Sequence, residues 1–185
     1  VASMCGITGA IWIDPDKAID AALLDRMTDS LTHRGPDDRG TLRSEFRRRP
    51  PYESQPGVAL GHRRLSIIDV AGGRQPISNE DETVWVVFNG EIYNFPALRQ
   101  RLEGSGHKFR TNTDTETLVH LWEDEGVEGF RHLIGMFALA IWDSRERKLI
   151  LARDRLGQKP LYYRHEPARL LFGSELKSIL AVPDV

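Results

Sequence analysis

The sequence predicts an α+β fold in which two stacked, mostly antiparallel β-sheets carry helices on their outer faces. Strand-like runs gather toward both ends of the chain, and helical patterns occupy mainly its middle. The runs near the carboxyl end follow one another across short polar turns, which is typical of antiparallel hairpins. An amphipathic helix and a sheet each need a partner for their apolar face, so this order favours a layered arrangement.

Three strands and a helix are expected in the first half of the chain, and four more strands are expected toward its end. The periods of two and of four residues indicate strand and helix, respectively. Strands are predicted over residues 5–13 and 58–65, and the wholly apolar run 84–88 is expected to be covered on both faces. A helix is predicted over residues 17–31, where Ile19, Leu23, Met27 and Leu31 recur every four residues. The remaining strands are predicted at 136–142, 148–153, 161–164 and 170–173.

Helix-start signals divide the middle of the chain. Asn94, followed by Pro96, predicts the beginning of a helix that stops near 104–106. Thr113 and Glu116 have the spacing of a capping box, and Gly126 is expected to end that second helix. Ser174 is expected to cap a final short helix.

Composition indicates one soluble globular domain. The chain has 185 residues, 40% of them apolar and 28% charged, and a formal net charge of −2. This charge favours neither nucleic acid nor an anionic membrane as a partner, and the basic run within 43–56 is interpreted as a solvated loop. One cysteine excludes an internal disulfide, and no apolar run approaches the length of a membrane span. We therefore expect a cytoplasmic protein.

The single cysteine, Cys5, is the candidate nucleophile. It follows Met4, and removal of that methionine would give Cys5 a free α-amine able to take the proton of its own thiol. A small apolar side chain at the start of a strand is the alternative. Residues 1–3 precede Met4 and are interpreted as a cloning remnant or an upstream start, so that the domain proper spans 4–185.

Three further positions could serve a thiol that attacks an amide. Asn89 and Gly90 supply two N–H donors where an apolar run ends, which fits an oxyanion hole, although Asn-Gly is also common in turns. One of Arg63 and Arg64 must face inward, and an inward arginine needs an anion such as a carboxylate. Asp114, in the first turn of a helix, could bind an ammonium or simply favour the helix dipole.

No metal site is predicted. The six histidines show neither HxxxH nor HExxH spacing, so a catalytic zinc is not expected, and no phosphate-binding glycine loop follows a strand.

Eight motifs together resemble the glutaminase domain of glutamine-hydrolysing asparagine synthetases. In chain order they are MCGI (4–7), HRGPD (33–37), GHRRLSIID (61–69), QPISN (75–79), NGEIYN (89–94), TDTE (113–116), GMFA (135–138) and RDRLGQKPLYY (153–163). The resemblance implies a class II glutamine amidotransferase with the four-layer αββα sandwich of the N-terminal-nucleophile hydrolases.

The resemblance also implies residue roles. Cys5 would be the nucleophile with its own amine as base, and Asn89 and Gly90 would stabilise the tetrahedral intermediate. The substrate would be L-glutamine, bound by the remaining residues of the motifs: Arg64, Ile67 and Ile68 on the α-carboxylate side, and Glu91 and Asp114 on the α-ammonium side.

In that family, a synthetase domain follows on the same chain and uses ATP, Mg²⁺ and aspartate. Since the sequence stops at Val185, we expect glutaminase activity alone here, with no cofactor in this domain and the linked synthetase domain as partner. The resemblance also admits a homodimer. The alternatives are a catalytically blocked glutamine-binding module and a relative that delivers ammonia to a different acceptor.

Overall fold

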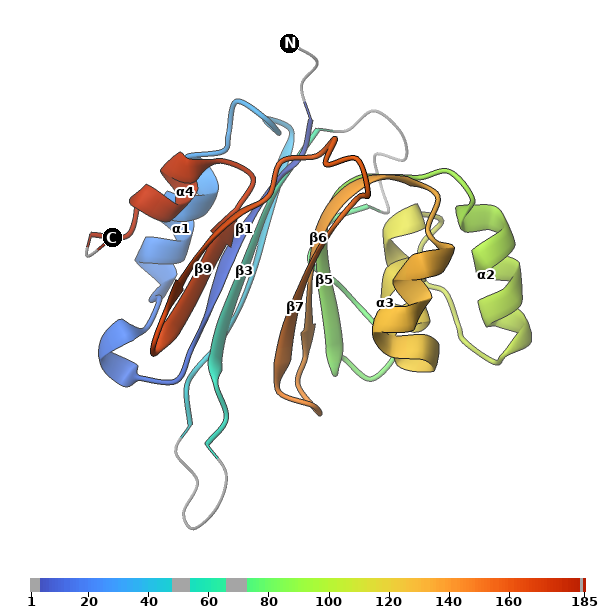
Figure 1. Ribbon diagram of the computed structural model, residues 1–185, viewed down its shortest axis with the longest axis horizontal. Coiled ribbons are helices and arrows are strands. Elements are labelled where there is room, and N and C mark those ends of the chain that lie inside the picture. Colours follow the sequence, from blue (N-terminus) through green and yellow to red (C-terminus); the bar gives the residue numbers. More distant parts are fainter. Residues whose placement is uncertain (1–3, 48–53, 66–72, 184) are drawn as a thin grey trace.

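A computed structural model of the chain describes residues 4–47, 54–65, 73–183 and 185. The protein has four layers, and two β-sheets face each other between two layers of helices (Figure 1). The first sheet has the strand order β2-β3-β1-β9-β8 and the second has the order β4-β5-β6-β7. All strand pairs among the described residues are antiparallel, so the predicted α+β sandwich is confirmed.

The first sheet joins both ends of the chain. Its strands are β1 (Gly6–Trp12), β2 (Asp38–Ser44), β3 (Gly57–Arg64), β8 (Tyr162–Glu166) and β9 (Arg169–Gly173). β1 lies in the middle, between β3 and β9, with Ile7 opposite His62 and Ala10 opposite Leu171. The first strand of the chain is therefore held in the centre of a sheet, not at an edge.

The second sheet is built from the central part of the chain. Its strands are β4 (Ile77–Ser78), β5 (Val84–Ile92), β6 (Gly135–Asp143) and β7 (Lys148–Arg153). β5 and β6 pair along their whole length, from Val84 opposite Asp143 to Ile92 opposite Gly135. The expected hairpins β6-β7 and β8-β9 are both present.

The helices cover the outer faces of the two sheets (Figure 1). Helices α1 (Ala21–Asp29) and α4 (Leu176–Leu180) pack on the first sheet, whereas α2 (Phe95–Gly104) and α3 (Asp114–Glu125) lie on the side of the second. Two short 3₁₀ segments, η1 (Pro15–Lys17) and η2 (Gly126–His132), complete the described elements. Among these residues, no helix is both long and apolar enough to cross a bilayer.

Three apolar clusters hold the layers together. The cluster between the sheets is formed by Ile7, Val58, Leu60, Val87, Ala138, Ala140, Trp142 and Phe172. A second lies between the first sheet and its helices and contains Trp12, Leu24 and Met27. The third lies between the second sheet and α2 and α3 and contains Phe88, Leu102 and Leu118 among others. Each sheet is thus buried on both faces.

The first predicted helix is shorter than expected. The helix over 17–31 is divided into η1 and α1, because Asp20 accepts a hydrogen bond from the Leu23 N–H (2.7 Å) and starts α1 there. Ile19 and Leu31 are fully buried although they lie outside the helix. The apolar residues that recur every four positions correctly predicted which side chains are buried, but they did not predict where the helix begins and ends.

β2 was missed, because its side chains are mostly polar and partly exposed, as is common for an edge strand. It lies at the edge of the first sheet and pairs only with β3.

Three predicted caps differ from the structure in detail. Thr113 is the N-cap of α3, but Glu116 accepts from the backbone N–H groups of Arg110 (2.7 Å) and Thr111 (2.6 Å), not from Thr113. Asn94 is the N-cap of α2, but its side chain donates to His132 O (2.9 Å). Ser174 accepts from the Ile7 N–H (3.0 Å), and Glu175 is the cap of α4.

Gly126 ends α3 as predicted, with φ 58° in the left-handed region that favours glycine.

Candidate active site

Cys5 lies immediately before β1, beside the end of β3. Its Sγ accepts from the Leu65 N–H at 3.5 Å and lies 4.0 Å from Leu65 O. Burial raises the pKa of the thiol, although the Leu65 backbone, Arg64 and Lys159 act in the opposite direction. A thiol with a raised pKa is a poor nucleophile by itself, so this position calls for a base.

Three of the predicted side chains lie on the inner faces of the two sheets. Ile7, Leu60 and Val87 belong to the cluster between the sheets. Side chains two residues apart in a strand share a face. Cys5 precedes Ile7 by two positions, Asn89 follows Val87 by two, and Arg64 follows Leu60 by four. These three candidate side chains are therefore on the same inner faces as the apolar residues.

Arg64 is the inward residue of the arginine pair. Its side chain is buried at the end of β3, whereas Arg63 on the outer face donates to Gly35 O (3.1 Å) and lies 3.7 Å from Asp29 Oδ1 of α1. A Cβ added to Gly73 would lie 2.5 Å from Arg64 Nη2, so the guanidinium packs closely against this glycine. The inner arginine is thus confined by packing at the point where β3 ends.

Asn89 and Gly90 lie within β5 and do not form a turn. The strand continues to Ile92, with Asn89 opposite Ala138, so the turn interpretation is wrong. Asn89 is 1% exposed, and its Nδ2 is buried without a hydrogen-bond partner among the described residues. A buried amide donor without a partner is costly, which makes it suited to an incoming acceptor atom.

Gly90 permits close approach of β5 to β6. A Cβ at this position would lie 2.3 Å from Met136 O, so a side chain would separate the two strands beside Asn89.

Glu91 and Asp114 are two acidic side chains close to each other, at the end of β5 and the start of α3. Asp114 Oδ2 accepts from the Ile92 N–H at 2.9 Å, which joins the start of α3 to the end of β5. Burial raises the pKa of Asp114, and the nearby Glu91 carboxylate raises it further. Two carboxylates in this arrangement are suited to a cation.

Three charged residues in the surroundings of Cys5 were not among the predicted site residues: Arg34, Glu175 and Lys159. Arg34 donates from Nε to Cys5 O (3.1 Å) and from Nη1 to Glu175 Oε1 (3.0 Å). Burial would raise the pKa of Glu175, but hydrogen bonds from Arg34, His33 and Lys177 lower it to about 2. Arg34 therefore ties the backbone of the nucleophile to the start of α4.

Lys159 is also close to Cys5, and only 6% of it is exposed. Its Nζ lies 2.8 Å from Met4 Sδ. Burial and the charge of Arg34 lower the pKa of Lys159, whereas Cys5 and Glu91 raise it. Arg34 and Lys159 belong to the motifs HRGPD (33–37) and RDRLGQKPLYY (153–163). Their place in these motifs is the one feature of the sequence that could have indicated that they lie near Cys5. Ile67 and Ile68, the remaining predicted residues, lie outside the described residues.

Comparison with known proteins identifies relatives of the whole chain. Asparagine synthetase [glutamine-hydrolyzing] 3 of Bacillus subtilis is 42% identical, and the alignment covers 98% of this chain and 28% of the relative. Asparagine synthetase [glutamine-hydrolyzing] 3 of Arabidopsis thaliana is 38% identical over 95% of this chain and 28% of the relative. The chain thus spans less than a third of the length of these curated relatives.

A solved structure shares the fold. The glutamine phosphoribosylpyrophosphate amidotransferase of B. subtilis, complexed with ADP and GMP, superposes with a TM-score of 0.73 and 23% identity, covering 96% of this chain and 43% of that one. This likeness extends over nearly the whole sandwich.

A family model described as a glutamine amidotransferase domain matches residues 4–185. That match includes Cys5, Arg64, Asn89 and Asp114, whose geometry is described above. The chain therefore belongs to the glutamine amidotransferase domain family, as its motifs predicted.

Proposed function

We propose that this domain hydrolyses L-glutamine to L-glutamate and ammonia, with Cys5 as the nucleophile. The observation that carries the proposal is that a half-buried thiol lies on the inner side of one sheet, and that the facing sheet holds a buried Asn89 amide that lacks a hydrogen-bond partner among the described residues. Family membership makes glutamine the substrate that this pairing would serve.

The proposed reaction begins with attack of the Cys5 thiolate on the side-chain carbonyl carbon of glutamine. The tetrahedral oxyanion would accept hydrogen bonds from Asn89 Nδ2 and the Gly90 N–H. The C–N bond then breaks, the leaving nitrogen takes the proton that came from the thiol, and ammonia departs. Water attacks the resulting glutamyl thioester, which gives glutamate and restores the thiol.

Charged residues would orient the substrate. In the proposal the α-carboxylate pairs with the Arg64 guanidinium, because a planar fork matches a carboxylate in two hydrogen bonds. The α-ammonium lies against Glu91 and Asp114, which supply negative charge at the facing strand end. Backbone groups near Ile67 and Ile68 would complete the carboxylate side.

The proposed base is the α-amine of Cys5 itself. This amine has a basic lone pair only when no residue precedes Cys5, since an acylated nitrogen is an amide. Burial raises the pKa of the thiol, so proton transfer to such a base is the step that would create the nucleophile. Arg34 would hold the Cys5 carbonyl while this transfer occurs.

The test compares two forms of the chain, one beginning at Cys5 and one that retains Met4. Glutamate release from glutamine is expected only from the form beginning at Cys5, and Cys5→Ser or Cys5→Ala should lower kcat by more than about 10³-fold. Calorimetric titration with glutamine is the second measurement. Binding without turnover by the form beginning at Cys5 would favour a glutamine-binding module and refute the glutaminase.

We further propose that the ammonia serves ATP-dependent synthesis of asparagine from aspartate. Support comes from relatives that are named glutamine-hydrolysing asparagine synthetases and are more than three times as long as the matched region. The longer protein, supplied with glutamine, aspartate, ATP and Mg²⁺, should form asparagine. Consumption of glutamine without asparagine would indicate a different acceptor.

A further inference from the structure

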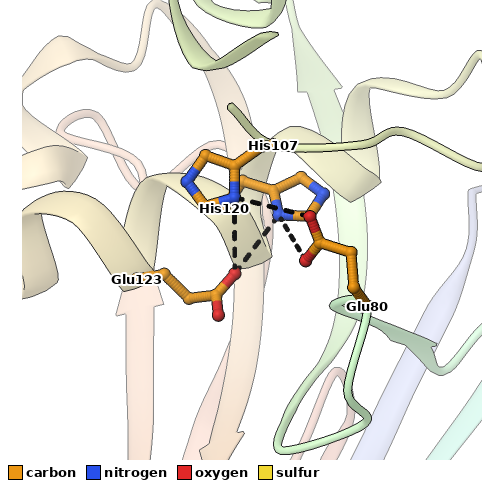
Figure 2. Close-up of side chains that lie close together, drawn as sticks. All are labelled: Glu80, His107, His120 and Glu123. Atoms are coloured by element: carbon orange, nitrogen blue, oxygen red, sulfur yellow. Dashed lines mark hydrogen bonds and ion pairs between the residues drawn. The ribbon is translucent and has the colours of Figure 1, made fainter. Parts of the chain in front are cut away.

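A second cluster of ionisable side chains lies on the far side of the second sheet, away from Cys5. Figure 2 shows its members: Glu80 from the turn between β4 and β5, His107 from the segment between α2 and α3, and His120 and Glu123 from α3. Three segments of the chain therefore direct two imidazoles and two carboxylates toward one point.

The separations within the cluster are those of metal ligands. One ligand atom from each residue lies within 4.8 Å of all the others. Glu123 Oε2 lies 3.2 Å from His120 Nδ1 and 3.8 Å from His107 Nδ1. Glu80 lies 3.6 Å from His120 Nδ1 through Oε2 and 3.7 Å from His107 Nδ1 through Oε1. A tetrahedral zinc ion with bonds of about 2.0–2.2 Å places its ligand atoms about 3.3–3.6 Å apart.

Both acidic ligands also have partners outside the cluster. Glu123 Oε1 accepts from Asn79 Nδ2 (2.7 Å) and Arg145 Nη2 (3.2 Å), which leaves Oε2 directed at the histidines. Glu80 Oε1 accepts from the Lys108 N–H (2.9 Å). Such outer contacts fix the orientation of metal ligands.

The histidines are oriented in the same way. His107 Nε2 lies 2.9 Å from Asp124 Oδ1, which places the proton on Nε2 and the lone pair of Nδ1 toward the cluster. His120 is fully buried, and its Nε2 lies 3.9 Å from Glu116 Oε1. Both rings therefore present Nδ1 to the shared point, and the His107 ring is held there by the carboxylate at its Nε2.

The cluster has the charge of a cation site. Glu80 and Glu123 contribute two carboxylates, and Asp124 and Glu116 stand behind the histidines.

We propose that Glu80, His107, His120 and Glu123 form a structural site for Zn²⁺. Mixed imidazole and carboxylate ligands suit zinc, and four protein ligands fill a tetrahedral shell and leave no position for a reacting water. The ion would join the β4-β5 turn and the segment before α3 to α3 itself. His120 and Glu123 lie about 9–14 Å along the helix from Asp114, so the ion acts on stability and not on the chemistry.

The test uses untagged, chelator-treated protein titrated with ZnSO₄, in the wild-type chain and in Cys5→Ala. The Cys5→Ala background excludes the thiol as a competing ligand. Calorimetry and elemental analysis should show one zinc per chain in both forms, and a hundredfold excess of zinc over Kd should raise Tm by roughly 5–10 °C. Co²⁺ in place of zinc should give the visible absorption of a tetrahedral complex.

The matched variants decide between this site and adventitious binding. His107→Gln and Glu80→Gln change partly exposed ligands and should weaken zinc binding at least tenfold and remove the Tm shift. His132→Gln is the control, because His132 forms an ordinary ion pair with Glu125 at 2.9 Å. The proposal is overturned if zinc does not bind at tenfold molar excess, if Cys5→Ala abolishes binding, or if His107→Gln binds as the wild type does.

Discussion

At the scale of single residues, the site depends on which face of a strand each side chain occupies. Arg63 and Arg64 are neighbours in the sequence but lie on opposite faces of β3, one against α1 and one between the sheets. Asn89 is directed inward by the same alternation in β5. Identical side chains one position apart therefore have different environments and different expected roles.

The arginine pair provides a matched test. Arg64→Lys in the form beginning at Cys5 should raise KM for glutamine about 10- to 100-fold, because losing a charge-assisted hydrogen bond costs ~1.5–3 kcal/mol. Arg63→Lys retains the charge on the outer face and should leave KM within about twofold. Steady-state glutamate release measures both. Equal KM values in the two variants would contradict binding of the α-carboxylate by Arg64.

At the scale of elements, a side chain takes over the backbone hydrogen bonding of β5 beyond the point where β4 ends. β4 pairs with β5 only at Ile77 and Ser78. Gln75 Oε1 then accepts from the Phe88 N–H (2.6 Å), in place of a backbone carbonyl, and its Nε2 donates to Thr115 Oγ1 (3.4 Å). One buried amide thus links β5, just before Asn89, to the first turn of α3.

We expect Gln75→Ala to destabilise the domain and to impair the site together. An unsatisfied Phe88 N–H costs ~1–3 kcal/mol, which corresponds to a fall in Tm of roughly 3–10 °C. Calorimetric melting measures the stability, and glutamate release measures the site. Gln100→Ala, an exposed change on α2, is the control and should shift Tm by less than about 1 °C. If the two variants melt alike, the Gln75 link contributes nothing.

At the scale of the whole molecule, the two sheets are joined by the central apolar cluster, and one buried imidazole lies between them. His62 of β3 is directed between the sheets, and the Phe88 backbone of β5 is among the groups that influence its pKa. Burial lowers the pKa of His62 from 6.5 to about 4. The folded protein therefore keeps this ring neutral at a pH where the unfolded chain protonates it.

This difference predicts a loss of stability in mild acid. Between pH 6.5 and pH 4 the unfolded chain binds a proton that the folded protein excludes, so the free energy of unfolding falls as the pH falls. His62 alone should account for ~2 kcal/mol between pH 7 and pH 5. Urea unfolding of wild type and His62→Gln at both pH values measures it.

The variant should lose less stability than the wild type over this interval, whatever its stability at pH 7. His165→Gln, on the exposed strand β8, is the control and should retain the wild-type dependence. An identical pH dependence in all three proteins would exclude the buried ring as its source.

Local pattern was sufficient for most of the fold and for much of the site. Period-two and period-four spacing located the buried strands and helices, since burial of one face leaves its mark on nearby residues. The motifs containing Cys5, Arg64, Asn89 and Asp114 were sufficient to predict the family that the comparisons show. These features depend on short sequence separation or on the order of motifs, both of which a sequence displays directly.

Other features were decided only by the tertiary structure. Arg34 reaches Cys5 and Glu175 from a distant loop, and Asn89 is in a strand because β6 lies alongside it. The proposed zinc ligands are spread over the chain from Glu80 to Glu123, and they do not follow the HxxxH or HExxH spacing. Contacts between residues far apart in the chain depend on how the layers pack, and packing is a property of the whole molecule that no local pattern records.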